Sequence, residues 1–300
     1  MVRKVYPVDQ SPFYKLHSKK KLANLLKISF PNLQRASKET YKQYNKFNIA
    51  KNEFEHRNVQ APSEDLKRIQ KRILVLLQRI EIPDWVIGGV SGKSYITNAK
   101  EHQNSQYILK VDIKKFYDNC TRDRVYRLFK DVFKTSSDVA KVLTNITTLD
   151  SIPTGSPTSQ LLAYLAYQDM FRSIYEISTS FGCTMTLYVD DLVFSNRNFF
   201  KYQRLTDLVR VELHKYSHNL KASKVKFYNT GTKGALVTGV IIQNGNLKIP
   251  NKLRIKIINS FNENKNKNNL KINSLKGQVY AAKRIEKEHF NGISTYIKES

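Results

Sequence analysis

Two adjacent aspartates, Asp190 and Asp191, stand between two apolar, β-favouring runs at 184–189 and 192–194. These runs predict two strands with the acidic pair at the turn between them. Carboxylates at this spacing repel one another and raise one another's pKa unless a cation neutralises them, and their hard oxygens suit Mg²⁺. The pattern therefore predicts a hairpin that presents a metal site. The alternative is a solvated Asp-Asp turn.

A third carboxylate, Asp112, lies near the end of the β-favouring run 107–113. Two-metal phosphoryl transfer needs two or three carboxylates from different strands, so that one metal activates the attacking hydroxyl and the other neutralises the leaving pyrophosphate. Asp112, Asp190 and Asp191 fit that need. We expect these three residues to be catalytic and metal-binding, with two Mg²⁺ ions, or Mn²⁺, as the cofactor.

With these aspartates in place, the chain resembles a reverse transcriptase. Residues 188–191, Tyr-Val-Asp-Asp, resemble the palm motif of that family. Residues 152–159, Ile-Pro-Thr-Gly-Ser-Pro-Thr-Ser, resemble the segment under the incoming nucleotide, and residues 56–62, His-Arg-Asn-Val-Gln-Ala-Pro, resemble the fingers motif whose basic residue meets the triphosphate. In order and spacing these motifs cover most of residues 50–240.

Two further segments narrow the resemblance to retron reverse transcriptases. Residues 98–102, Asn-Ala-Lys-Glu-His, match an Asn-Ala-x-x-His signature, and residues 237–239 match a Val-Thr-Gly signature. Alone, the first could be a helix end with a solvent-facing histidine and the second a strand closing on a glycine bulge. Their joint occurrence on either side of a palm favours the retron type.

Selection of one RNA must come from residues that read shape, unpaired bases or 2′-hydroxyls, because phosphate contacts hold any duplex. The signature segments lie outside the metal-binding motifs, so their residues are the candidates for RNA recognition: Asn98, His102, Val237, Thr238 and Gly239. A buried structural histidine is the alternative for His102.

The resemblance also implies contacts with the nucleotide. Arg57 is expected to pair with the triphosphate. Thr154 and Gly155 lie in the motif under the nucleotide, where related sequences usually have Gln in place of Thr154. The shorter threonine has less reach, although Gly155 permits close approach of the backbone.

Two more roles follow from the resemblance. Tyr117, five residues past Asp112, is where the family places an aromatic ring under the sugar, which selects deoxynucleotides. The adjacent Phe116 is its rival, because neighbouring aromatics at a strand end point to opposite faces and one of them is normally in the core. Lys226 is a candidate proton donor to pyrophosphate, and Lys224 lies nearby on the same side of a predicted strand.

The implied fold is α+β: a right-hand polymerase with fingers, a palm formed by an antiparallel sheet backed by helices, and a small helical thumb. We expect N-terminal helices and fingers over 1–106, a palm that includes a primer-grip hairpin over 107–249, and a basic thumb over 250–300. Two β-favouring runs between 235 and 249 flank the Asn-Gly pair at 244–245, which is a hairpin signal. Apolar periodicity predicts helices over 14–28, 64–80, 159–177 and from Ser274 onward.

Composition agrees with a nucleic-acid partner. The chain of 300 residues carries 51 Lys and Arg against 25 acids, a formal net charge of +26. Such a field attracts a polyanion through phosphate contacts. Its 2 cysteines allow no disulfide framework or Cys-rich zinc site. No apolar stretch long enough for a bilayer and no signal-peptide core is evident, so we expect no membrane partner and a bacterial cytoplasmic location.

The resemblance implies an RNA-directed DNA polymerase that copies part of its own structured noncoding RNA into DNA, primed from a guanosine 2′-hydroxyl, in phage defence. Its expected partners are the cognate RNA and DNA product, deoxynucleoside triphosphates, an effector protein and, because the chain leaves no room for an RNase H domain, a host RNase H. The alternatives are another bacterial reverse transcriptase of the group II intron type, or a non-catalytic RNA-binding subunit that restrains a toxic effector.

Overall fold

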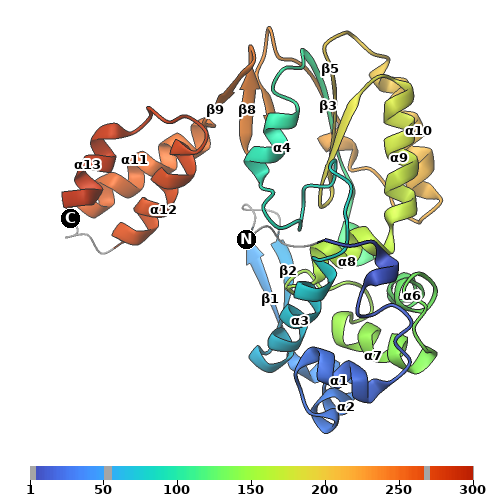
Figure 1. Cartoon of the computed structure of the whole chain (residues 1–300). Helices are drawn as coiled ribbons and strands as arrows, with labels where there is room; N and C mark the ends of the chain where they lie inside the picture. Colours follow the sequence, from blue (N-terminus) through green and yellow to red (C-terminus); the bar gives the residue numbers. More distant parts are fainter. Residues whose placement is uncertain (1–4, 51–55, 267–270, 300) are drawn as a thin grey trace. The chain divides into compact units, whose positions relative to one another are not determined.

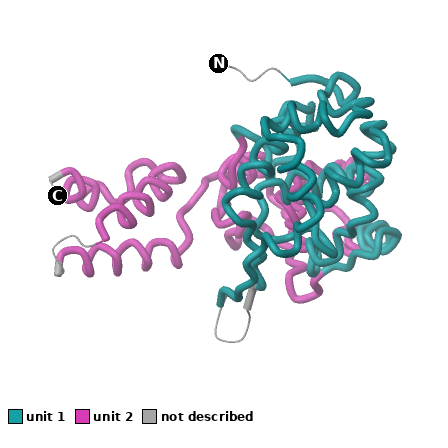
Figure 2. The backbone as a smooth tube through the Cα atoms, turned by 90° about the horizontal axis from the view of Figure 1, so that it is seen from below, with its two compact units in different colours: residues 1–92, 113–176, 209–220 teal, residues 93–112, 177–208, 221–300 magenta. Residues whose placement is uncertain are grey.

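The chain combines helices with antiparallel sheets, which confirms the α+β class (Figure 1). The computed structural model describes residues 5–50, 56–266 and 271–299. Two compact units are present (Figure 2), each built from segments that are separated in the sequence. The first comprises residues 1–92, 113–176 and 209–220, and the second comprises 93–112, 177–208 and 221–300. The expected polymerase subdomains are a different division of the chain and stay a prediction.

The first unit is mainly helical. Strands β1 (Tyr44–Ala50) and β2 (His56–Pro62) pair antiparallel as a two-stranded sheet. Ser63 caps α3 by accepting a hydrogen bond from the Leu66 amide, which confirms the predicted helix start. The helices and helical turns are η1 (Val8–Gln10), α1 (Lys19–Leu26), α2 (Phe30–Lys38), η2 (Thr40–Gln43), α3 (Glu64–Leu77), α5 (Phe116–Asn119), α6 (Arg122–Arg127), η3 (Leu128–Val132), α7 (Ser137–Thr147) and α8 (Ser159–Ala166).

The helix predicted over 159–177 is two helices, because α8 ends before Tyr167 and α9 (Gln168–Ser180) follows it. Tyr167 is only 1% exposed. Its hydroxyl accepts a hydrogen bond from the Thr121 amide at 3.0 Å and donates one to the Asn119 carbonyl at 3.1 Å. These contacts fix the residue at the break. Helices α9 and α10 (Tyr202–His214) contribute residues to both units.

The second unit contains a four-stranded antiparallel sheet with the order β4-β5-β3-β6. A second sheet has the order β7-β8-β9. The strands are β3 (Tyr107–Asp112), β4 (Thr184–Tyr188), β5 (Asp191–Asn196), β6 (Lys226–Asn229), β7 (Ala235–Val237), β8 (Val240–Gln243) and β9 (Asn246–Lys248).

One hydrophobic core joins the two sheets of this unit through helix α4 (Tyr95–Glu101). Ile96 and Ala99 of α4 pack with Ile108 of β3 and Val193 of β5, and the β7–β8 residues Ala235, Val237, Val240 and Ile242 complete the cluster. Since side chains alternate along a strand, Ile108 shares its face of the sheet with Lys110 and Asp112. The helix therefore covers one end of the face that bears the carboxylates.

Two predictions for this region need correction. The segment 235–249 forms three strands, because a turn at Thr238-Gly239 precedes the predicted turn at Asn244-Gly245. All four turn residues have positive φ, which is the backbone twist that two-residue hairpin turns require. The strand predicted to hold both Lys224 and Lys226 begins only at Lys226, because the helical turn η4 (Ala222–Lys224) precedes β6.

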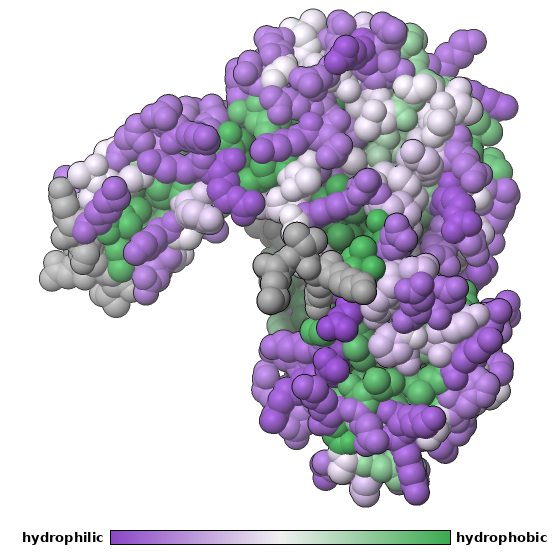
Figure 3. Space-filling view, viewed as in Figure 1, coloured by the Kyte–Doolittle hydropathy of each residue, from purple (hydrophilic) through white to green (hydrophobic). Residues whose placement is uncertain are grey.

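The last helices are α11 (Asn251–Asn266), α12 (Ile272–Lys283) and α13 (Asn291–Glu299). Leu275, Val279 and Ala282 of α12 are buried with Ile257 of α11, which confirms the predicted apolar side of that helix. Hydrophilic residues predominate on the surface of these helices on the face seen in Figure 3. Among the described residues, no helix combines the length and the apolar character needed to cross a membrane.

Candidate active site

The hairpin of β4 and β5 presents the acidic pair as the sequence predicts. Tyr188 pairs with Asp191 across the two strands, which leaves Val189 and Asp190 as the turn. Val189 has a φ of 64°, a left-handed conformation that is costly for a β-branched side chain. Such strain persists where the surrounding structure imposes it, and it is common at functional sites.

Asp112 lies directly opposite Asp191 in the antiparallel register of β3 and β5. Opposed residues of an antiparallel pair share one face of the sheet, so the two carboxylates are neighbours. Asp112 is 5% exposed. Lys224 forms an ion pair with its carboxylate, and the Lys110 ammonium lies 3.3 Å from Asp191 Oδ2.

The three carboxylates influence one another electrostatically. Burial, followed by repulsion from Asp112 and Asp191, raises the pKa of Asp190 to about 6. Burial also raises the pKa of Asp191, and Lys110 opposes this effect. For Lys224, burial lowers the pKa, but the hydrogen bond to Asp112 and the surrounding carboxylates outweigh it and raise the pKa. The negative charges of the three carboxylates are therefore not fully compensated, and additional cations would stabilise their ionised forms.

The chemistry of the three side chains fits divalent metal ions, because carboxylates are hard oxygen ligands and the pKa is raised at two of them, Asp190 and Asp191. In the described part of the chain, however, no three His, Cys, Asp or Glu side chains converge closely enough to hold an ion as they stand. Lysine ammonium groups bond two of the carboxylates. Lys224 bonds only Oδ2 of Asp112, so the other oxygen of this carboxylate has no lysine from the described residues bonded to it.

Lys110 was not singled out from the sequence, and Lys224 was named only as a neighbour of the candidate Lys226. Alternation along β3 could have indicated Lys110, since it lies two residues before Asp112 on the same face. Lys224 ends the helical turn η4, which the sequence does not reveal. The predicted candidate Lys226 is exposed and pairs with Lys110 across β3 and β6, so Lys224 and not Lys226 contacts a carboxylate.

Three of the nucleotide-binding candidates lie together in the first unit. Thr154 Oγ1 donates a hydrogen bond to the carbonyl of Asn58 in β2 at 2.9 Å. A Cβ atom at Gly155 would lie 2.5 Å from the Gln60 carbonyl oxygen. The close backbone approach that glycine permits here is thus to β2. Arg57 is in the same strand, opposite Ile49, but its side chain lies outside the described parts of the chain.

Phe116 and Tyr117 begin the short helix α5 instead of ending a strand. Phe116 is 4% exposed, and its ring centroid lies 5.9 Å from that of Phe171 and 5.3 Å from that of His218. Tyr117 is partly buried. Phe116 is therefore a core residue of the first unit, whereas Tyr117 retains exposed surface.

The two signature segments meet in the second unit. Thr238 has a φ of 43° in the β7–β8 turn, and its hydroxyl donates to the Tyr95 carbonyl at 2.9 Å. The same hydroxyl accepts a hydrogen bond from Asn98 Nδ2 at 3.3 Å. Asn98 is fully buried in α4. Asn98 and the backbone of Tyr95 thus hold a threonine in a turn conformation that β-branched residues disfavour.

His102 is fully buried directly after α4. Its Nε2 and Nδ1 atoms each lie 2.7 Å from a hydroxyl oxygen, that of Thr186 in β4 and that of Ser195 in β5 respectively. Burial lowers the pKa of His102 to about 3, so the ring is neutral. Burial of Asn98, His102 and Val237 leaves these side chains no surface with which to contact RNA, which corrects that part of the prediction. Thr238 and Gly239 keep exposed surface.

Comparison with known proteins agrees with this geometry. Residues 49–242 match the model of the family described as reverse transcriptase (RNA-dependent DNA polymerase). The chain belongs to the reverse transcriptase family. The matched region contains all three aspartates. Members of this family act with divalent metal ions.

Curated relatives include retron reverse transcriptases, as the signature segments predicted. The chain is 27% identical to the Retron Se72 reverse transcriptase of Salmonella heidelberg (strain 579083-10) over 213 residues, 69% of this chain and 56% of the relative. It is 26% identical to the Retron Ec83 reverse transcriptase of Escherichia coli over 278 residues, 86% of this chain and 88% of the relative. The chain thus spans little more than half of the first relative and most of the second.

Proposed function

We propose that this reverse transcriptase is a retron-type, RNA-directed DNA polymerase that uses a two-metal mechanism. The observation that supports the proposal most directly is the register of Asp112 opposite Asp191, beside a turn that holds Asp190. Three carboxylates on adjacent strands, with a pKa of about 6 at Asp190, are the arrangement that divalent cations neutralise. The retron type rests on the relatives and on the contact between the signature residues Asn98 and Thr238.

In this proposal Asp112 and Asp190 would hold the two Mg²⁺ ions, and Asp191 would support the site. When bound, the ions supply Lewis-acid stabilisation of the attacking and leaving oxygens. Lys224 and Lys110 neutralise the carboxylates before the metals arrive. Lys224 is then free to interact with the polyphosphate, which makes it a stronger candidate than Lys226 for that role.

The remaining site roles are proposals that follow the family motifs. Arg57 pairs with the triphosphate, and the β2 contacts of Thr154 and Gly155 fix the segment that lies under the nucleotide. Tyr117 selects the deoxyribose, since Phe116 is committed to the core. In polymerase terms, residues 1–106 provide the fingers, 107–249 the palm, and 250–300 a basic thumb.

At the level of the whole protein, we propose that the enzyme copies part of a structured noncoding RNA from a guanosine 2′-hydroxyl primer. The product is single-stranded DNA joined to that RNA. An effector protein, a host RNase H and a role in phage defence complete the proposal, and the bacterial cytoplasm is its proposed location. These proposals rest on the names of the relatives and on the net charge of +26.

Primer extension tests the activity. The purified protein should extend a DNA primer annealed to a generic RNA template with deoxynucleotides and Mg²⁺. Asp190→Asn keeps the shape of the side chain and removes its charge, so extension should fall by orders of magnitude while affinity for the annealed primer–template barely changes.

The matched control is Asp131→Asn, which removes one carboxylate from an exposed position outside the site. It should extend the primer as well as the wild type. Substantial extension by Asp190→Asn would remove this residue from the mechanism. Absence of extension by a folded wild-type protein that still binds the primer–template would favour a non-catalytic RNA-binding role.

A further inference from the structure

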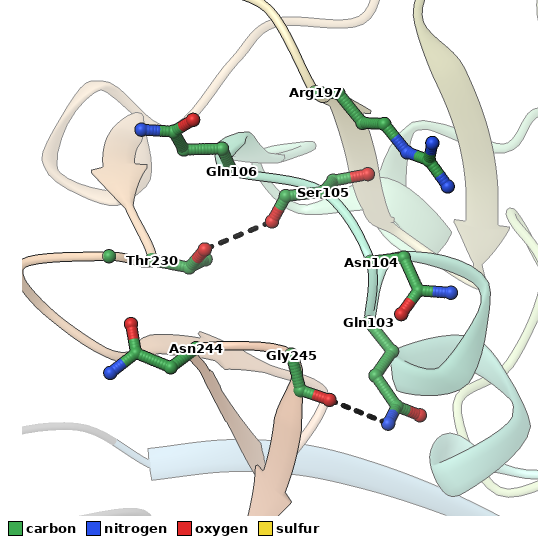
Figure 4. Close-up of a pocket in the computed structure, with 9 residues that line it drawn as sticks. Gln103, Asn104, Ser105, Gln106, Arg197, Thr230, Asn244 and Gly245 are labelled. Carbon is green, nitrogen blue, oxygen red and sulfur yellow. Dashed lines mark hydrogen bonds between the residues drawn. The ribbon is translucent and has the colours of Figure 1, made fainter.

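A polar pocket of about 530 Å³ lies in the second unit, at the Tyr107 end of β3 (Figure 4). The aspartate site is at the other end of the same strand, which has 6 residues. The pocket is lined by the loop 103–106 between α4 and β3, by Arg197 after β5, and by the turns at 230–231 and 244–245. It is therefore a separate feature from the carboxylate site.

Hydrogen bonds fix the walls of this pocket to one another. Gln103 Nε2 donates to the Gly245 carbonyl at 2.8 Å, which joins the loop after α4 to the β8–β9 turn (Figure 4). Thr230 Oγ1 donates to the Ser105 carbonyl at 3.0 Å, and the Thr230 amide donates to the Gln106 carbonyl at 2.8 Å. A framework held at several points keeps its shape without a ligand, which lowers the entropic cost of binding.

Both signature segments support this framework without lining the pocket. Ser105 donates to Ser195 at 2.9 Å, and Ser195 is one of the two hydroxyl partners of His102. On the other side, strand β8 connects the turn of Thr238, which Asn98 holds, to the turn at 244–245 in the pocket wall. The buried signature residues thus position the exposed polar residues around the pocket.

The chemistry of the lining favours a nucleotide. Asn104, Gln106 and Asn244 present exposed amides, and Arg197 presents an exposed guanidinium, while no lining residue is acidic. Amides both donate and accept, as base edges and 2′-hydroxyls do. A guanidinium binds phosphate or stacks on a base. Sequence-specific recognition of RNA mostly uses unpaired bases, whose edges are open to hydrogen bonds from side chains such as these.

We propose that this pocket binds an unpaired ribonucleotide, with its phosphate or base on Arg197 and its base edge or 2′-hydroxyl on the amides. The proposal rests on the polymerase function proposed above and adds to it a site that selects the RNA. Recognition by retron signature residues is, on this view, indirect: His102 and Asn98 shape the pocket, and the residues at its rim make the contacts.

Binding of short single-stranded oligonucleotides tests the site. The probes are fluorescent oligo(rA), oligo(rC) and oligo(rU), with oligo(dA), oligo(dC) and oligo(dT) as DNA counterparts, measured by anisotropy. An excess of unlabelled annealed primer–template occupies the polymerase site. The double variant Gln106→Ala/Arg197→Ala should bind at least one of the ribo-oligonucleotides about tenfold or more weakly than the wild type does. Asn104→Ala should weaken it in the same direction, and the DNA probes should be affected less.

The matched control is Gln203→Ala/Arg204→Ala, which removes the same groups from exposed positions on α10. Its affinity should stay within about twofold of the wild type, as for ordinary surface substitutions. Equal losses in both double variants would show general charge attraction and overturn the proposal, as would unchanged binding by both pocket variants or equal losses for RNA and DNA.

Primer extension on a generic annealed template separates this proposal from the proposed function. The pocket variants should extend the primer normally, because the pocket is remote from the carboxylates along β3. If the wild type did not extend the primer but bound ribo-oligonucleotides through the pocket, the polymerase proposal would fail and the RNA site would stand. If the wild type extended the primer normally and the pocket variants still bound RNA as tightly as the wild type does, only the pocket proposal would be overturned.

Discussion

At the scale of single residues, the charges of the candidate active site are unevenly balanced. Lys224 and Lys110 bond Asp112 and Asp191. At Asp190 a backbone hydrogen bond and, after it, Lys224 lower the pKa, but burial and the two acidic neighbours outweigh them. Asp190 is therefore the carboxylate with most to gain from a cation. Removing the charge of Asp190 should therefore have a large effect on catalysis.

Sugar selection is the second residue-scale question. Tyr117→Ala should raise incorporation of ribonucleotides relative to deoxynucleotides, since the ring proposed to meet a 2′-hydroxyl is removed. Phe116→Ala should mainly destabilise the protein, by about 3–5 kcal/mol, because Phe116 packs in the core. Primer extension with each nucleotide class and urea unfolding measure the two effects.

Tyr117→Phe is the control, because it keeps the ring and should keep the selectivity. If Phe116→Ala altered sugar selection in a stable protein while Tyr117→Ala did not, the two assignments would have to be exchanged. The sequence could name this pair but could not decide between them, because it predicted a strand end where the chain forms α5.

The other residues of the site also divide into those that the sequence could predict and those that it could not. Adjacent carboxylates and β-favouring runs were sufficient to predict the hairpin at Asp190 and Asp191, because its turn depends on local pattern. The position of Asp112 opposite Asp191 depends on the pairing of β3 with β5, and the catalytic role of the three residues stays a prediction. The contact of Lys224 with Asp112 could not be predicted, because it depends on the turn η4. The burial of His102 could not be predicted either, because it depends on which helix covers the sheet. Tertiary packing decides such contacts, and it leaves little local signal.

At the scale of elements, His102 links the two strands of the hairpin that bears the acidic pair. It bonds β4 through Thr186 and β5 through Ser195. His102→Ala would leave two buried hydroxyls without these partners and a cavity beneath the sheet. We expect a loss of about 2–4 kcal/mol in the free energy of unfolding, measured with urea at about pH 7.5.

The burial of His102 also predicts that the stability of the protein depends on pH. Burial holds the pKa of His102 at about 3, whereas an unfolded histidine titrates near 6.5. Between these values the unfolded state binds more protons, so this contribution to stability is complete above about pH 6.5 and is lost as the pH falls. His218, with a pKa lowered to about 4 by burial and then by Arg124, acts in the same direction.

His102→Gln retains groups that donate and accept hydrogen bonds but does not titrate, so acidification from about pH 7.5 to 5.5 should cost it less stability than it costs the wild type. Urea midpoints at the two pH values give the comparison. His214→Gln, at an exposed histidine near the end of α10, should behave as the wild type does. Equal acid sensitivity of His102→Gln and wild type would mean that His102 is not buried in its neutral form.

Elements with strong local signals were predicted well. The Ser63 cap begins α3, and Asn244-Gly245 forms the turn between β8 and β9. The turn at Thr238 was missed, because a β-branched residue with positive φ has no local justification. It exists because Asn98 and the Tyr95 carbonyl bond its hydroxyl, and these partners lie about 140 residues away.

At the scale of the whole molecule, the net charge of +26 governs how tightly any nucleic acid is held. Residues 250–300 contribute 11 Lys and Arg against 4 acids. In α11, Lys252 and Lys256 are exposed one helical turn apart, beside the exposed Ile255. This surface suits the backbone of a duplex, which requires charge and shape more than sequence-specific contacts.

Lys252→Glu/Lys256→Glu should therefore weaken binding of an RNA–DNA duplex of any sequence, most strongly at low salt. Removing one lysine–phosphate interaction should reduce the salt dependence of log K by roughly one, so the slope should become shallower by about two for the double variant. Anisotropy titrations over a series of salt concentrations measure this slope. Lys38→Glu/Lys141→Glu makes the same change of charge at exposed positions of α2 and α7. If that control gave the same change in slope, the duplex would be responding to total charge, whereas an effect confined to α11 would identify this helix as the surface that follows the backbone.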